Sequence, residues 1–245
     1  MNISYKNPIL VEQFAELYLA KGSLSAEKVI HFVPHIEAVG FNQIEMANIE
    51  EFSLNLAPGR PDSLNRTATT PRIRCWNKDK NKLIQLFEDR IVVHQVGQYL
   101  GWDEFRSLFE QTLNICSSQL SNFKTESVVF QTIDQFEVDS KDFVFSKYLS
   151  CDGSIFPAWY KDEKSSGDLT LGKGLLNEEG KNRQIHASIR KTAEKTIVNL
   201  RCVFQSLLQN GTPMKLLENL HEESNKTFEA MITEHTRTNV MMGTK

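Results

Sequence analysis

The chain has 245 residues, of which 40% are hydrophobic and 24% charged, and its formal net charge at pH 7 is −3. This balance is typical of a globular protein with a packed core, and it excludes both a disordered chain and a strongly basic nucleic-acid-binding domain. Widely spaced cysteines without a C-x-x-C pair, no signal-peptide pattern and no apolar run near the ~20 residues of a membrane span predict a cytoplasmic protein with no membrane partner.

The first part of the chain predicts a strand followed by a short helix. Residues 8–19 are rich in aliphatic and aromatic side chains, as strands are. Ser23-Leu24-Ser25 is a plausible cap for a helix that buries Val29, Ile30 and Val33. We expect Pro34 to limit this helix or to start a second short one.

The next part predicts mostly extended chain. Residues 41–56 are expected to be extended, and residues 57–71, rich in Pro, Ser, Thr and Asn, are expected to form a long surface loop. Three strands joined by short turns should then form a β-meander over residues 72–96.

A helix is predicted over Trp102–Leu120, where apolar residues recur at intervals of three and four. Residues 128–138 and 143–149 look extended, and residues 150–168 look like a second irregular stretch. The segment Leu171-Gly172-Lys173-Gly174-Leu175 lacks the full phosphate-loop pattern, so we expect a hairpin turn there.

Residues 184–190 and 196–208 alternate as a long hairpin. One face is apolar, and the other is polar enough to meet solvent or a ligand. Basic residues on such a sheet can grip phosphates, which makes nucleic-acid or nucleotide binding one hypothesis and an ordinary solvated face the other. The candidate residues are Arg183, His186, Arg190 and Arg201, expected on one face of this hairpin, with Arg72 and Arg74 in the meander.

The last predicted element is an amphipathic helix of ~20 residues that begins at Thr212-Pro213, a cap followed by proline at the first helical position. Its apolar stripe can pack within the chain, form a homodimer or dock on a protein partner. The stripe consists of Leu216, Leu217, Leu220, Phe228, Met231 and Ile232.

Three passages resemble a sporadically distributed family of bacterial proteins of about this length, for which no activity is assigned. They are Tyr5-Lys6-Asn7-Pro8-Ile9-Leu10-Val11-Glu12, then Lys82–Leu86 with Ile91–Val93 and Gly101–Phe105, and finally Leu220–Glu223 with Phe228–Thr233. The resemblance implies carriage on mobile or defence-linked genome segments, and it provides no catalytic residue.

No motif for catalysis, cofactor binding or metal binding stands out. His31 and His35 are spaced for one helix face, but Pro34 interrupts that turn and no H-E-x-x-H pattern is present. The acids Asp134, Glu137, Asp139 and Asp142 have irregular spacing and are expected to be solvated strand ends. We therefore expect no cofactor and no metal; the sequence leaves enzymatic activity open and favours a non-enzymatic protein.

These observations favour a single α+β domain over residues 1–245, with antiparallel sheet, helices packed on one face and a C-terminal amphipathic helix. Two related β-α-β halves, 1–122 and 123–245, are an alternative within this fold. The favoured function is a non-enzymatic binding or scaffold protein that acts with a partner, and the resemblance implies a role in bacterial defence. Nucleic-acid or nucleotide binding through the basic hairpin is the alternative.

Overall fold

The computed structural model describes residues 5–20, 24, 26–55, 63–120, 123–150, 167–177, 181–209 and 211–242. In this part of the chain, nine strands form an antiparallel sheet that carries helices, which confirms the expected α+β class. The chain divides into two compact units. Unit 1 comprises residues 1–15, 95–101 and 127–245, and unit 2 comprises residues 16–94 and 102–126. Strand β1 (Leu10–Leu19) contributes its first part to unit 1 and its second part to unit 2.

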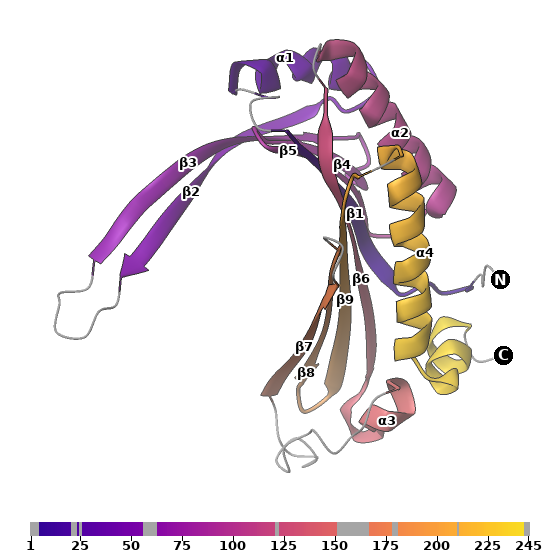
Figure 1. The fold of residues 1–245 in the computed structure, drawn as a ribbon. Helices are drawn as coiled ribbons and strands as arrows, with labels where there is room; N and C mark the ends of the chain where they lie inside the picture. Colours follow the sequence, from indigo (N-terminus) through magenta and orange to yellow (C-terminus); the bar gives the residue numbers. More distant parts are fainter. Residues whose placement is uncertain are drawn as a thin grey trace. The chain divides into compact units, whose positions relative to one another are not determined.

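Unit 2 contains a sheet in the strand order β2-β3-β4-β5-β1, with two helices on one side (Figure 1). The predicted meander and the second predicted helix are both present. The elements are α1 (Ala26–Glu37), β2 (Gln43–Asn55), β3 (Ser63–Trp76), β4 (Lys82–Leu86), β5 (Arg90–Val96) and α2 (Trp102–Gln119).

The buried stripe of α1 differs from the predicted one. Ile30 is 54% exposed, whereas Val29, Phe32 and Ile36 are buried. The helix continues through Pro34 to Glu37, so the proline neither ends it nor starts a second one. The reason is the period: positions 29, 32 and 36 share one helix face, and Ile30 lies off it.

Strands β2 and β3 form a long two-stranded ribbon, visible in Figure 1 as the hairpin that extends away from the helices of unit 2. They pair from Gln43 with Trp76 to Asn55 with Ser63, with one irregularity at Glu51/Phe52. Of the residues of β3, only 73–76 also pair with β4. The expected loop over 57–71 is therefore wrong for residues 63–71, and residues 57–62 lie outside the described residues. The non-local partner β2 overrides the turn-forming composition of this segment.

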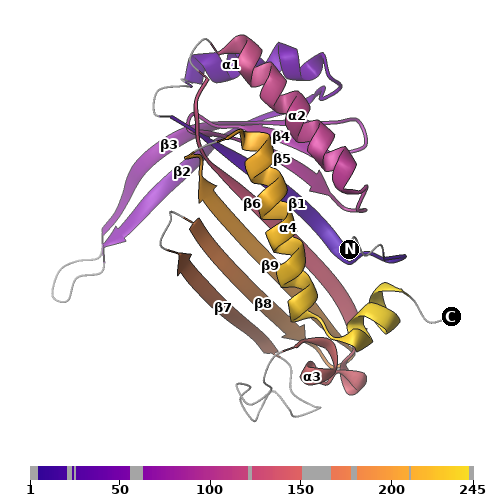
Figure 2. The same ribbon diagram turned by 45° about the vertical axis from the view of Figure 1, so that its right-hand side comes forward.

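Unit 1 contains the strand order β1-β6-β9-β8-β7 with α4 packed along it (Figure 2). The predicted hairpin is present as β8 and β9. The elements are β6 (Thr125–Asp139), η1 (Ser140–Asp142), α3 (Phe145–Tyr148), β7 (Gly167–Asn177), β8 (Lys181–Lys191), β9 (Lys195–Leu207), α4 (Pro213–Met231) and the π-helical segment η4 (Thr236–Met241).

Two predictions in unit 1 are wrong. The segment 171–175, expected as a turn, lies inside β7 and pairs with residues 183–187 of β8. The segment 143–149, expected as a strand, contains the helical turn α3, in which Phe145 and Tyr148 are buried. The adjacent strand and the apolar core decide these conformations, and neither is visible in the local sequence. Residues 151–166 of the expected irregular stretch lie outside the described part of the chain.

Helix α4 begins as predicted. The Thr212 hydroxyl oxygen accepts a hydrogen bond from the backbone N–H of Lys215 at 3.2 Å, and Pro213 is the first helical residue. Leu217 and Leu220 are buried against the sheet, and α4 packs on β9. No helix of the described residues is long and apolar enough to cross a membrane.

The two parts of the chain repeat one order of elements. A strand is followed by a helix, a run of antiparallel strands and a second helix, first as β1, α1, β2 to β5 and α2, then as β6, α3, β7 to β9 and α4. Two related halves would share such an order, and their relation stays a prediction. The single-domain assignment and the boundary between residues 122 and 123 stay predictions.

Candidate functional site

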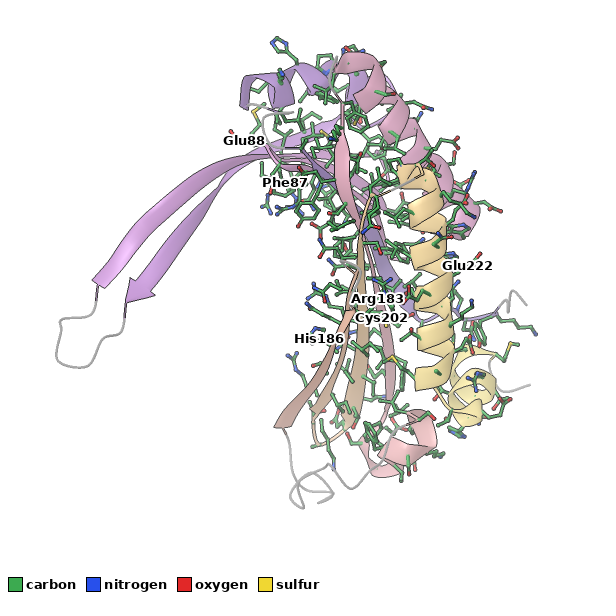
Figure 3. All side chains as sticks on the ribbon, viewed as in Figure 1. Phe87, Glu88, Arg183, His186, Cys202 and Glu222 are labelled. Carbon is green, nitrogen blue, oxygen red and sulfur yellow. The ribbon has the colours of Figure 1, made fainter. Side chains whose placement is uncertain are left out.

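The two faces of the β8–β9 hairpin differ as the alternation predicted. Strand β9 alternates between buried and more exposed residues along its length, with Val198, Leu200 and Cys202 on the side that packs on α4. His186 and Arg201 are register partners on the opposite side. Figure 3 shows this difference, with Cys202 toward α4 and His186 on the side away from the helix. Helix α4 thus does not cover the side of the hairpin that carries His186 and Arg201.

Arg183 does not join that face, and this corrects the expectation that four basic residues share it. Its side chain is 6% exposed and lies on the α4 side, where Nε and Nη2 each donate a 2.6 Å hydrogen bond to the Glu223 carboxylate. Nη1 donates to the carbonyl oxygens of Asn182 and Gln205 at 3.0 and 2.6 Å. Position 183 has the same parity as the apolar positions 185, 187 and 189, and this parity was the available signal.

The side chains of β6, β8 and β9 on the side away from α4 form what we call the polar face, in which Gln131 is buried and the others are partly or fully exposed. Arg201 donates from Nη2 and Nε to the Gln131 amide oxygen at 2.7 and 3.1 Å. Gln135 Nε2 donates to Asn199 Oδ1 at 2.9 Å. By strand alternation and register, the face consists of Gln131, Gln135, Gln184, His186, Ser188, Arg190, Asn199 and Arg201.

Aliphatic side chains alternate with these polar groups. Ile133, Ile197 and Val203 are partly exposed and share the parity of the polar face on their strands. At the strand ends, Lys195 pairs with Asp139 at 2.9 Å and lies 3.5 Å from Glu137. The aromatic residues of these strands, Phe130, Phe136 and Phe204, are buried on the other side. The described part of this face therefore offers hydrogen bonds and apolar contacts, with no aromatic ring for base stacking.

Arg72 and Arg74, the remaining basic candidates, lie on β3 of unit 2. Arg74 is 3.4 Å from the Glu45 carboxylate and stacks over the Trp76 ring at 5.3 Å. Strand alternation puts both arginines on the side of β3 opposite Cys75. They belong to unit 2, whereas the polar face belongs to unit 1.

Three titratable groups with strongly shifted pKa values, Asp134, Cys202 and His221, lie where α4 packs on the sheet and not on the polar face. Burial raises the pKa of the Asp134 carboxyl to about 7 and that of the Cys202 thiol to about 12. Burial lowers the pKa of His221 to about 4. Such shifts can indicate catalysis, but these groups are enclosed in packing between helix and sheet, where Thr132 and Ser224 are 3.4 Å apart. They read as core polar groups.

The described residues contain no cluster of metal ligands, and two surface depressions lie in unit 2. No group of three or more His, Cys, Asp or Glu in this part of the chain is placed to hold a metal ion. A depression of about 440 Å³ lies over the exposed surface of α2, lined by Ser107 and Glu110 among others. A groove of about 210 Å³ lies among the end of α1, the β3–β4 turn and α2, where Lys82 and Glu104 form an ion pair at 2.9 Å.

The apolar stripe of the C-terminal helix packs within unit 1. Leu217, Leu220 and Ile232 are buried, and Ile232 lies just beyond the helix end, where it bridges to Leu149. The remaining predicted positions, Leu216, Phe228 and Met231, are partly buried. The structure therefore uses this stripe inside the chain, and partner docking through it stays a prediction.

No protein-family model matches the chain, and no curated protein matches it significantly. The resemblance to a sporadically distributed bacterial family stays a prediction for that reason.

Proposed function

We propose that this chain is a non-enzymatic binding protein that attaches to a protein partner through the polar face of unit 1. The observation that carries the proposal is the composition of that face, where amide and aliphatic side chains alternate and charged groups are few. Centres of protein interfaces are depleted of charged residues, and a typical interface carries about one hydrogen bond per 100–200 Å². The face has donors, acceptors and apolar contacts in such a mixture.

Hydrogen bonds within the face support the proposal. Gln131 is fixed by two donors of Arg201, and Gln135 is fixed by Asn199. Each side chain ordered before association saves about 0.5–1.5 kcal/mol of binding free energy that would otherwise be lost in ordering it. A pre-ordered amide face is suited to hold a partner without a conformational change.

The β2–β3 ribbon supports a scaffold role through a second surface. Strand β2 is the terminal strand of the hydrogen-bonded order in the described residues, so its outer backbone groups lack a strand neighbour there. Open strand edges can accept an extended segment of another chain. The family resemblance adds an expected context, a partner encoded beside this chain in a defence-linked genome segment.

Nucleic-acid binding through the basic hairpin is less well supported than protein binding. Arg183 is engaged with Glu223 on the other side of the sheet, and Arg201 donates to Gln131. The hairpin face thus has fewer cations than the sequence suggested, and phosphate recognition depends on cations. We therefore favour a protein partner for the polar face.

Affinity purification from cells of the source organism, followed by native mass spectrometry, tests this function. The test variant is Ile133→Lys with Ile197→Lys on the polar face. The matched control is Asn219→Lys with Ala230→Lys on the exposed side of α4, which adds the same charge. We expect a protein subunit at fixed stoichiometry with the wild type and the control, and its loss from the test variant. Absence of any stoichiometric subunit, or its retention by the folded test variant, contradicts the proposal.

A further inference from the structure

Unit 2 has a second sheet face, on the side of the strands away from α1 and α2, where Arg72, Arg74, Trp76 and Tyr18 are partly exposed and Phe87 and His94 are buried. The charge of Glu37 on α1 contributes to raising the pKa of the Cys75 thiol, so Cys75 faces α1. Because side chains alternate along a strand, Arg72, Arg74 and Trp76 face the other way. Arg74 is the register partner of Gln85 on β4, which puts Gln85 on the same face. Figure 3 shows Phe87 on this side, away from the two helices.

Cations and aromatic rings alternate across this face. Arg90 pairs with Phe87 across the β4–β5 turn, and its guanidinium lies over the Phe87 ring at 4.4 Å and over the Tyr18 ring at 5.5 Å. The β3–β4 register, continued by one residue beyond Ile73 and Leu86, puts Arg72 beside Phe87. We call Arg72, Phe87, Arg90 and Tyr18 the arginine–aromatic row.

A parallel arrangement lies one step along the same strands. The Arg74 guanidinium stacks over Trp76 at 5.3 Å, and Gln85 Nε2 lies 2.7 Å from His94 Nε2. The face therefore presents guanidinium groups over the Trp76, Phe87 and Tyr18 rings, together with an amide and an imidazole. Aromatic rings and guanidinium planes are the groups on which nucleobases stack in proteins.

Unsatisfied donors lie at the same place. The Nε atoms of Arg72, Arg74 and Arg90 are buried and have no hydrogen-bond partner among the described residues. Arg90 Nε lies 3.2 Å from a Glu16 oxygen, but without hydrogen-bond geometry. Arg90 Nε is thus in an ion pair, whereas the Nε atoms of Arg72 and Arg74 are not. Buried polar groups are nearly always paired, so two orphan cationic donors on one face indicate an acceptor-bearing ligand.

The local charge favours a phosphate-bearing ligand. Glu45 accompanies Arg74, and Glu16 and Asp89 accompany Arg90, whereas no carboxylate is within ion-pair distance of Arg72 in the described residues. The β3–β4 turn at the edge of this face adds the exposed Lys78, Asp79 and Lys80, which together carry one net positive charge. A cationic edge beside stacking platforms is the arrangement that single-stranded nucleic acid needs for its phosphates and bases.

We infer that this face of unit 2 binds single-stranded nucleic acid without sequence preference. Arg72 and Arg90 contact phosphates, and the Trp76 and Tyr18 rings, with the guanidinium planes on them, receive bases. Single strands fit better than a duplex because the rings can stack only on unpaired bases. This inference does not depend on the protein partner proposed for unit 1.

Fluorescence anisotropy with a fluorescein-labelled dT20 strand, measured between 50 and 300 mM NaCl, tests the inference. We expect saturable binding by the wild type. Arg72→Gln with Arg90→Gln should weaken it at least tenfold and reduce the slope of log K against log salt by about 1.4, since each lost single-strand phosphate contact removes ~0.7. Trp76→Leu should weaken binding with an unchanged slope, because stacking releases no counterion.

The matched control is Arg106→Gln with Lys215→Gln, which removes the same charge from helix surfaces. It should retain wild-type affinity, and circular dichroism must show native helix content for every variant. No binding by the wild type, an equal loss in the control, or an unchanged affinity of the Arg72/Arg90 variant overturns the inference. Equal binding of a dT20·dA20 duplex, or equal competition by polyglutamate of similar length, also overturns it, the latter in favour of an acidic protein.

Discussion

Arg183 of β8 and Glu223 of α4 form an ion pair with two 2.6 Å hydrogen bonds that joins the helix to its sheet. The arginine side chain is 6% exposed and its guanidinium lies 5.2 Å from the centre of the Phe204 ring, whereas the glutamate side chain is 46% exposed. The pair is thus buried at one end and solvated at the other. Such a pair contributes mainly through the cost of separating it.

Glu223→Gln is expected to destabilise the chain by about 2–3 kcal/mol. The change leaves a buried guanidinium with a weaker acceptor, and the value is below the ~3–5 kcal/mol of a fully buried pair because water reaches the Glu223 side. Urea unfolding measures the free energy. Arg183→Met with Glu223→Gln completes a double-mutant cycle, and a coupling energy near zero would show that the pair adds nothing.

Asp134 is expected to make the chain less stable as pH rises. Its folded pKa of about 7 lies above the ordinary value of 3.8, so the folded state holds a proton that the unfolded state has lost. Stability from this group is complete below about pH 4 and is lost as pH rises to 7. Asp134→Asn removes this titration. The free energy of unfolding of the variant, measured in urea relative to that of the wild type, should therefore rise by about 2–3 kcal/mol from pH 5 to pH 8. An equal relative stability at both pH values would show that Asp134 is ionised in the folded protein.

His221 is expected to make the chain less stable as pH falls, over a pH range that overlaps that of Asp134. Its folded pKa of about 4 lies below the ordinary 6.5, so the unfolded state binds the extra proton between these values. Stability from this group is present above pH 6.5 and falls by about 3 kcal/mol as pH drops toward 4. His221→Gln should flatten that part of the wild-type profile. Direct NMR titration of the imidazole provides an independent check, and a pKa near 6.5 in the folded protein would contradict the prediction.

Three cysteines are expected to be unreactive in the folded chain. Burial raises the pKa of Cys75, Cys116 and Cys202 to about 12. At neutral pH this lowers the reactive thiolate fraction about a thousandfold relative to a free cysteine. In a Cys151→Ser variant, Ellman's reagent should modify the native protein on the time scale of unfolding and the urea-unfolded protein within seconds. Rapid native labelling would show that at least one of the three is accessible.

Elements with a strong local period were predictable. Helix α2 is fixed by apolar residues at helical spacing, helix α4 by its stripe and the Thr212-Pro213 start, and the β8–β9 hairpin by period-two alternation. The same alternation placed His186 and Arg201 on the polar face. Applied strictly, it would also have put Arg183 on the helix side, because parity is a purely local property.

Elements that depend on distant partners were not predictable. Residues 63–71 have the composition of a loop and become a strand by pairing with β2, and residues 171–175 become a strand by pairing with β8. The arginine–aromatic row was missed for the same reason. Tyr18 and Phe87 are far apart in sequence, and only the β1-β5-β4 order puts both rings beside Arg90.

The division of β1 between the units has a consequence for the order of folding. Residues 5–15 leave the ribosome long before residues 127–245, yet they belong to the same unit. The carbonyl oxygen of Ile9 accepts from the Gln135 N–H at 2.7 Å, and the Asn7 N–H donates to the Met241 carbonyl oxygen at 2.7 Å. Closing such a long loop loses conformational entropy before the non-local contacts that offset this loss can form. Folding of the unit is therefore slow. Residues 5–15 therefore cannot complete their unit until residues 127–245 have been synthesised. Until then this segment is exposed, so it can bind chaperones or aggregate.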